Sequence, residues 1–376
     1  MKITFISDFL NHHQIPLCDA WMSNQDVQFA FIATEQVPEE RKAMGYNSEF
    51  SNYSYCKEIG NGYTMEEAEQ LCYDSDVVLI GSASQQYIRR RLKKNKLTFL
   101  YSERFFKDGM WTHPGDILRT MKMTTVNRFK SFYVLCASSY TAGDCRRVGF
   151  GNKTMKWGYF PQTMQYSSGQ IIENKKQGMI KLLWVGRLLK WKHPEVFLSV
   201  CNELKKLGYT FTADIIGEGE MKREISDYIQ TKGLSENVKM LGSMSPDKVR
   251  EKMEKSNIFL FTSGYREGWG AVLNEAMNSG CVVVACGEAG ATKYLVKHEK
   301  NGLLYEDCDD EKRVFELVKK CIDNRELCTE LGDKAYDTIL HTWNAEVAAT
   351  RLYEFSKAFL NKKPLPQYLE GPMSQA

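Results

Sequence analysis

The sequence contains no run of the roughly 20 consecutive apolar residues that a membrane-spanning helix needs. Its first residues, MKITFISDFL, are too few and too polar to resemble a secretory signal peptide. Internal repeats and low-complexity tracts are also absent. We therefore expect a protein that is soluble or that lies on a membrane surface.

The cysteines lack the spacing of a cross-linked or metal-binding framework. There are eleven of them, an odd number, and no C-x-x-C pair occurs. This distribution argues against a secreted disulfide framework and against a structural zinc site. We therefore expect a reducing, cytoplasmic location.

Charge is nearly balanced overall but is unevenly distributed. The 376 residues have a formal net charge of +3, yet residues 85–160 hold sixteen Lys or Arg against four Asp or Glu. This asymmetry indicates an anionic partner for one face of the N-terminal half. The length and the 43% hydrophobic content are sufficient for two domains with separate cores.

Short apolar runs alternate with helical patterns, which favours α/β domains with mostly parallel sheets. The strands expected in the first half are Ile3–Ser7, Val27–Ala33, Val77–Ile80, Thr98–Tyr101 and Val134–Ala137, with Ser48–Tyr55 ambiguous. Those in the second half are Leu182–Val185, Thr212–Ile216, Val238–Leu241, Ile258–Phe261 and Val282–Val284. The expected helices are Met65–Cys72, Gln85–Leu92, Glu195–Leu207, Met221–Thr231, Pro246–Lys255 and Ala345–Asn361. The polar segment 165–178 is the expected linker.

The segment TSGYREGWGAVLNEAMNSGCVVVA, residues 262–285, carries the most specific pattern in the chain. Glu267 and Glu275 are separated by seven residues, with Gly-Trp-Gly directly after Glu267 and a helical pattern through Glu275. One carboxylate is therefore expected in a loop at a helix N-terminus and the other within the helix. Helix N-termini attract phosphate, and carboxylates accept hydrogen bonds from sugar hydroxyls. The pattern indicates a nucleotide-sugar site.

This segment resembles the Glu-x7-Glu motif of retaining glycosyltransferases, and residues 181–305 resemble family 4 of those enzymes. The resemblance implies the GT-B fold, an α/β architecture in which two Rossmann-like, doubly wound parallel-sheet domains face a cleft. Residues 1–164 would bind the acceptor and residues 179–344 the nucleotide sugar. The C-terminal helix, within residues 345–376, would cross back to the first domain.

Two cations follow the first strand of the second domain. Arg187 and Lys192 come directly after a glycine turn, and Arg offers a planar fork where Lys offers a point charge. The pair matches the family's diphosphate-binding positions, with Lys190 as an alternative to Lys192. Such cations would stabilise the leaving nucleoside diphosphate, so we expect transfer without a metal or other cofactor.

The resemblance assigns further donor contacts. Glu275 would bind the ribose, Glu267 the transferred sugar, and the backbone of Gly268, Trp269 and Gly270 the diphosphate and sugar. Whether Trp269 packs or contacts sugar is left open by the sequence. Gly217 ends a strand and would admit the nucleotide to the backbone, and Leu241 lies near the base; a plain turn at Gly217 is an equal alternative.

The first domain offers acceptor-binding candidates. His12 and His13 follow the first strand, where many family members have a glycine-rich loop that this chain lacks. Either histidine could contact the donor phosphates or the acceptor; we place His13 among the catalytic candidates. Glu103, after the strand at residues 98–101, is the nearest carboxylate for acceptor contact.

Residues 89–130 combine basic and apolar side chains. Six cations lie within residues 89–96, and later cations alternate with Phe105, Phe106, Trp111, Met121 and Met123. This composition suits an anionic membrane surface, although a solvated face is the alternative. No recognised nucleic-acid motif is present, and we expect no nucleic-acid partner.

Together these features predict a retaining hexosyltransferase acting from a nucleoside-diphosphate sugar, with UDP as carrier. The acceptor would be a hydroxyl of a glycan or lipid-linked glycan in cell-surface polysaccharide synthesis, at the inner face of the plasma membrane. The alternatives are a GT-B-fold phosphorylase, a nucleotide-sugar epimerase, or a non-catalytic protein that binds membrane surfaces.

Overall fold

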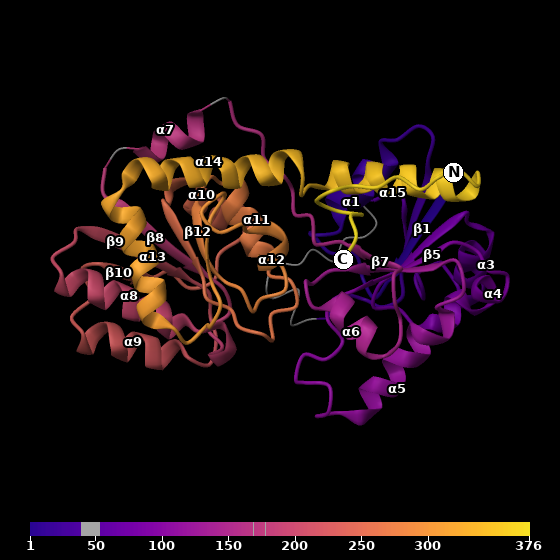
Figure 1. The fold of residues 1–376 in the computed structure, drawn as a ribbon, viewed down its shortest axis with the longest axis horizontal. Helices are drawn as coiled ribbons and strands as arrows, with labels where there is room; N and C mark the ends of the chain where they lie inside the picture. Colours follow the sequence, from indigo (N-terminus) through magenta and orange to yellow (C-terminus); the bar gives the residue numbers. More distant parts are fainter. Residues whose placement is uncertain (39–52, 168, 177) are drawn as a thin grey trace. The chain divides into compact units, whose positions relative to one another are not determined.

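The computed structural model describes residues 1–38, 53–167, 169–176 and 178–376. The chain forms two compact units, one comprising Met1–Gln162 with Trp343–Ala376 and the other Thr163–Thr342 (Figure 1). Most of the ambiguous segment Ser48–Tyr55 lies outside the described residues.

The first unit is built on a seven-stranded sheet in which all pairings are parallel. The strand order is β3-β2-β1-β4-β5-β6-β7, so the order reverses between β1 and β4. The strands are β1 (Lys2–Ser7), β2 (Gln28–Ala33), β3 (Cys56–Glu58), β4 (Val77–Ile80), β5 (Thr98–Ser102), β6 (Phe132–Cys136) and β7 (Thr154–Lys156).

Helices cover both faces of this sheet. The C-terminal helix α15 (Ala345–Leu360) packs beside α1 (Ile15–Met22), and the Trp21 indole donates to the carbonyl of Ala349. Phe355 of α15 contacts Phe99 and Tyr133 of the sheet. The remaining helices are α3 (Met65–Asp74), η2 (Gln85–Ile88), α4 (Arg89–Lys93), α5 (Pro114–Met123), η3 (Thr125–Asn127) and α6 (Thr141–Arg147). The last 34 residues thus belong to the first unit because α15 buries its apolar face there.

The second unit repeats this plan with six parallel strands in the order β10-β9-β8-β11-β12-β13. The order reverses between β8 and β11. The strands are β8 (Ile180–Val185), β9 (Phe211–Ile216), β10 (Val238–Met240), β11 (Ile258–Phe261), β12 (Val282–Cys286) and β13 (Leu303–Tyr305).

Figure 1 shows the helices of the second unit in two layers, one on each face of its sheet. One layer holds η4 (Lys190–Lys192), α8 (Pro194–Lys206), α9 (Lys222–Thr231) and α13 (Glu311–Asp323). The other holds α7 (Gln170–Lys176), α10 (Pro246–Lys255), α11 (Ala271–Asn278) and α14 (Arg325–His341). A short helix, α12 (Thr292–Leu295), follows β12.

The polar segment 165–178 is not a free linker as expected, because it contains α7 and is packed into the second unit. The buried ammonium group of Lys175 donates to the carbonyls of Met253 and Ser279. No helix of the described ranges has both the length and the apolarity needed to cross a bilayer.

Candidate active site

The strand order of the second sheet reverses between β8 and β11, whose carboxyl ends lie side by side. In open parallel sheets such a switch point is where ligands bind. The loop after β8 carries Arg187 and Lys192, and the loop after β11 carries Glu267. The topology therefore brings the predicted cations and the first predicted glutamate to one edge of the sheet.

Lys192 and Glu267 form an ion pair at this edge of the sheet. Both side chains are mostly buried, with exposed fractions of 12% and 13%. Backbone contacts hold the two loops together. The Thr262 hydroxyl donates to the carbonyl of Lys192 at 2.6 Å, and the Gly264 amide donates to the carbonyl of Trp191 at 3.0 Å. A cation and a carboxylate are thus fixed side by side where a charged ligand would bind.

The glycine loop after Glu267 leads directly into α11. Gly270 precedes the helix with φ +93°, and a Cβ there would lie 2.4 Å from the Phe261 ring, so only glycine fits. Trp269 is fully buried and its indole donates to the Asn274 amide oxygen at 2.9 Å. Of the two alternatives left open for Trp269, packing is the one observed.

Glu275 lies on α11, one turn beyond the glycine loop. Burial raises the pKa of its carboxyl group, an effect that the charge of Arg250 opposes. The Arg250 guanidinium donates to the carbonyl of Glu275 at 3.2 Å and to Asn278 Oδ1 at 3.0 Å. Glu275 is therefore held at low dielectric beside a cation.

The remaining donor-site candidates lie at the carboxyl ends of neighbouring strands. Arg187 is exposed after β8. Gly217 follows β9 with φ +139°, and a Cβ there would lie 1.9 Å from the carbonyl oxygen of Gly186. Its amide donates to the carbonyl of Gly242, next to Leu241. Glycine is thus required at 217 by the close packing of three loops.

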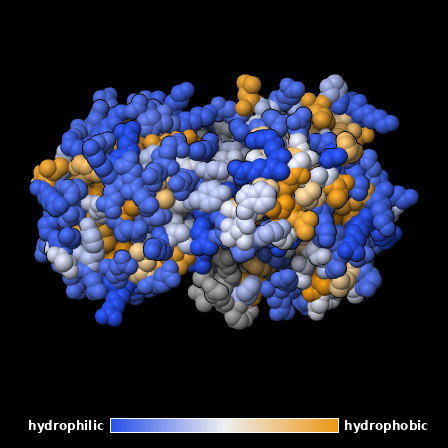
Figure 2. Space-filling view, turned by 60° about the horizontal axis from the view of Figure 1, so that its bottom comes forward, coloured by the Kyte–Doolittle hydropathy of each residue, from blue (hydrophilic) through white to orange (hydrophobic). Residues whose placement is uncertain are grey.

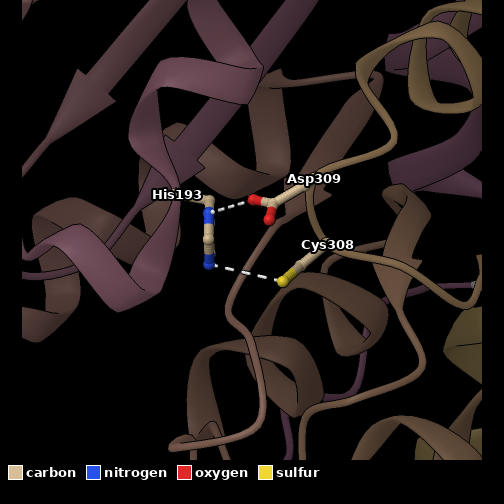
Figure 3. A group of neighbouring side chains, drawn as sticks. All are labelled: His193, Cys308 and Asp309. Atoms are coloured by element: carbon tan, nitrogen blue, oxygen red, sulfur yellow. Dashed lines mark hydrogen bonds and ion pairs between the residues drawn. The ribbon is translucent and has the colours of Figure 1, made fainter.

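The sequence analysis missed a cluster next to these loops. His193 directly follows Lys192, and its two ring nitrogens face different partners (Figure 3). Nε2 lies 3.3 Å from Cys308 Sγ, while Nδ1 lies 3.1 Å from a Glu195 oxygen and 3.2 Å from an Asp309 oxygen. Hydrogen bonds with Cys308 and Glu195 raise the pKa of His193 to about 10. No sequence spacing indicates this grouping, because 115 positions separate His193 from Cys308.

In the first unit, Tyr159 brings two predicted residues together. Its ring stacks on His13 at a centroid distance of 5.9 Å, and its hydroxyl donates to Glu103 Oε1 at 2.7 Å. Lys107 donates to the other carboxylate oxygen of Glu103. His12 packs against His13, and burial lowers its pKa. Because His13 follows β1 at the switch point of this sheet, the trio occupies its ligand-binding edge.

The predicted basic region divides into two parts. Arg91 is fully buried and donates to Thr98 Oγ1 and to the carbonyls of Cys72, Ser75, Asp76 and Leu97, so this cation of the cluster at 89–96 is structural. The predicted neighbours Phe105 and Phe106 form backbone hydrogen bonds to Asp144, and Phe106 is buried. The cluster at 89–96 is therefore not a uniformly solvent-facing array of cations.

Around α5, by contrast, apolar side chains face solvent. Trp111 is 80% exposed and Phe129 is 85% exposed, and Leu118, Met121 and Val126 are also exposed. Figure 2 turns this side of the first unit toward the viewer and shows hydrophobic residues interspersed among hydrophilic ones. We refer to residues 111–130 as the α5 surface.

Part of the chain is similar to a known protein family and to curated proteins. Residues 170–338 match the family model described as Glycosyl transferases group 1. A putative colanic acid biosynthesis glycosyltransferase WcaL of Escherichia coli K12 is 27% identical over 185 residues, covering 48% of this chain and 45% of WcaL.

Two further relatives carry activity names. The poly(ribitol-phosphate) alpha-N-acetylglucosaminyltransferase of Staphylococcus aureus is 28% identical over 43% of this chain and 32% of its own length. An alpha-N-acetylgalactosaminyltransferase of Campylobacter jejuni, whose name specifies a diphospho-undecaprenol acceptor, is 31% identical over 41% of this chain and 40% of its own length. The matches thus span less than half of each of these curated relatives.

Solved structures extend the likeness to nearly the whole chain. HepE of Anabaena, crystallised with UDP, superposes with a TM-score of 0.70 at 16% identity, covering 95% of this chain and 100% of HepE. Sucrose-phosphate synthase of Thermosynechococcus elongatus gives a TM-score of 0.68 at 14% identity, covering 96% and 100%. We conclude that the chain has the predicted GT-B fold and that residues 170–338, within its second unit, match the group 1 glycosyl transferases.

Proposed function

We propose that the protein is a retaining glycosyltransferase that moves a hexosyl unit from a UDP-sugar to a hydroxyl group of a glycan or lipid-linked glycan. The observation that carries this proposal is the Lys192–Glu267 ion pair beside the glycine loop at the switch point. The family match over residues 170–338 and the glycosyltransferase names of the relatives support it.

On the donor side, Arg187 and Lys192 would neutralise the charge that develops on the leaving diphosphate. Preorganised cations of this kind stabilise the transition state without needing a metal at the diphosphate. Gly217 would let the nucleotide approach the backbone, and Glu275 would accept hydrogen bonds from the ribose. The UDP bound in the HepE structure supports UDP as the carrier.

In the transfer step, Glu267 would contact the transferred sugar. The acceptor hydroxyl would attack the anomeric carbon from the face that the diphosphate leaves, and the leaving phosphate oxygen would accept the hydroxyl proton. UDP-hexoses are commonly α-linked, so the alpha linkages named for two relatives support retention.

On the acceptor side, we assign His13, Tyr159 and Glu103. Their mutual contacts at the switch point of the first sheet present an imidazole, a phenol and a carboxylate that suit sugar hydroxyls. The relatives named for colanic acid and for a diphospho-undecaprenol acceptor support a role in cell-surface polysaccharide synthesis. The α5 surface would hold the protein at the cytoplasmic membrane face where such acceptors are made.

The test is transfer from a panel of UDP-hexoses and UDP-N-acetylhexosamines to lipid-diphosphate and oligosaccharide acceptors, followed by mass spectrometry and NMR assignment of the anomeric linkage. Donor binding is measured separately by thermal shift, where a ligand at a hundredfold excess over Kd stabilises by about 2.7 kcal/mol. A product with inverted configuration would refute retention. Absence of binding by every nucleotide sugar would refute the transferase assignment.

A further inference from the structure

Two groups of metal-ligating side chains share Cys308: Cys286, Glu288 and Cys308 form one, and His193, Cys308 and Asp309 form the other. Cys286 ends β12, Glu288 follows it, Cys308 follows β13, and His193 precedes α8. The donor atoms of Cys286, Glu288 and Cys308 all lie within 4.8 Å of one another. We propose that this cluster, hereafter the Cys308 cluster, binds one zinc-type divalent cation.

Two separations at Cys308 match those between neighbouring ligands of a zinc ion. Cys308 Sγ lies 3.3 Å from His193 Nε2 and 3.4 Å from Glu288 Oε2. With Zn–S bonds of about 2.3 Å and Zn–N or Zn–O bonds of about 2.0 Å, neighbouring ligand atoms lie roughly 3.3–3.8 Å apart. A set of two thiolates, one imidazole and one carboxylate is typical of zinc rather than of magnesium or calcium.

Outer contacts orient these ligands as they do in known metal sites. Metal-binding histidines commonly place a carboxylate on the second ring nitrogen, and His193 Nδ1 faces Glu195 and Asp309 while Nε2 faces Cys308 (Figure 3). Glu288 Oε2 also accepts a hydrogen bond from the Tyr265 amide at 3.2 Å. The ring orientation and one carboxylate oxygen are therefore already fixed.

The backbone approaches the cluster closely at Gly264. A Cβ on Gly264 would lie 3.1 Å from Cys308 Sγ, 3.3 Å from His193 Nε2 and 3.4 Å from Glu288 Oε2. Any larger residue at 264 would thus project among the three donor atoms. His193 itself has φ +49°, a backbone conformation that is uncommon for residues other than glycine.

The cluster is continuous with the loops that hold the ion pair. His193 is adjacent to Lys192, and the Gly264 amide binds the carbonyl of Trp191. A bound cation would therefore brace Lys192 and Glu267 without touching the diphosphate. This structural role goes beyond the proposed transfer reaction and is compatible with metal-independent chemistry at the donor.

The test uses the full-length protein after chelator treatment under reducing conditions, titrated with Co²⁺ and then with Zn²⁺. We expect one metal ion per chain by elemental analysis, a near-ultraviolet thiolate-to-cobalt absorption, and displacement of Co²⁺ by Zn²⁺. C308S and H193G should each weaken binding at least 100-fold. H193G also relaxes the backbone at this position, so it keeps the test valid if C308S does not fold.

C328A is the matched control, because Cys321 and Cys328 form a second adjacent thiol pair in the same unit. It should retain full binding. Absence of the thiolate–cobalt band in the native protein, or an unchanged affinity in both C308S and H193G, would overturn the proposal. So would thiol trapping that shows Cys286 and Cys308 joined in a disulfide in the isolated protein. Metal content is read independently of transferase activity, so either proposal can fail alone.

Discussion

The ammonium group of Lys192 pairs with the carboxylate of Glu267, 75 residues later in the chain. Each residue follows a strand that borders the reversal of the second sheet, and both side chains are mostly buried. In water such a pair contributes little, but a ligand that enters here would meet two oriented charges with little solvent to screen them.

Replacing Glu267 with Gln is expected to reduce turnover by about 100- to 1000-fold, the range found when one preorganised polar group is removed from an active site. Glu330→Gln is the matched control, since Glu330 forms an exposed ion pair with Lys334 on α14 of the same unit. Turnover is measured with saturating donor, and unfolding is followed by circular dichroism. Equal rates in native protein and E267Q would remove Glu267 from the mechanism.

Replacing Gly217 with Ala should destabilise the second unit and weaken donor binding, because the new Cβ would clash with the carbonyl oxygen of Gly186. Gly208→Ala separates this clash from backbone strain: Gly208 also has a positive φ, but a Cβ there would have open space. The strain alone costs about 1–2 kcal/mol. Urea unfolding should therefore show a larger loss for G217A than for G208A, and similar losses would contradict the close-packing argument.

The raised pKa of the Glu275 carboxyl group predicts that the stability of the fold depends on pH. Its folded-state pKa is raised by burial, so the folded protein holds this proton more tightly than the unfolded chain does. The contribution of Glu275 to stability is therefore greatest below its ordinary pKa and is lost as pH rises through the raised value.

Glu275→Gln removes this titration. Relative to the native protein, E275Q should gain stability as pH rises above about 4.5, as measured by urea unfolding at several pH values. Glu251→Gln, at an exposed position of α10, controls for the general effect of removing one negative charge. A stability difference that does not change with pH would show that burial does not govern Glu275.

The α5 surface should bind anionic vesicles. Trp111 and Phe129 are mostly exposed, and each would contribute about 2 kcal/mol on burial in lipid. W111S and F129S should each lower the affinity for phosphatidylglycerol vesicles by roughly 30-fold in co-sedimentation. L369S is the control, because Leu369 is 97% exposed in the same unit but outside this surface. Binding that is equally strong in all three variants would exclude the α5 surface.

Arg91→Met should destabilise the first unit by at least about 3 kcal/mol, because it leaves several buried carbonyl groups without a donor. Arg89→Met, at an exposed neighbouring position, should change stability by less than about 0.5 kcal/mol. Thermal unfolding checks both. A small change in stability in R91M would mean that water molecules donate hydrogen bonds to these carbonyl groups instead.

Local pattern was sufficient for the longer elements. The predicted strands at 77–80 and 258–261 and the helix at 246–255 match β4, β11 and α10 residue for residue. Continuous apolar runs between turn signals identify such buried parallel strands. The three-residue strands β3, β7 and β13 were not predicted, whereas the equally short β10 was predicted within residues 238–241.

The motif around Glu267 likewise predicted a donor site, and the structure places this motif at the edge where the strand order of the second sheet reverses. Its glycines could be interpreted from the sequence because they meet local requirements of the backbone, such as the positive φ of Gly270 before α11. The sequence alone also placed Arg187 and Lys192 after a strand end, where α/β proteins bind ligands. What the sequence determined was the fold class and most of the order of its elements; the residues of one ligand-binding edge stay a prediction.

Only the tertiary structure decided which distant side chains meet. It buried Arg91 within a basic run, packed Trp269 away from solvent, packed the predicted linker into the second unit as α7, and placed Cys308 next to Cys286, Glu288 and His193. These contacts join positions far apart in the chain. Their geometry depends on how strands and helices pack, and side-chain packing leaves no spacing pattern in the sequence.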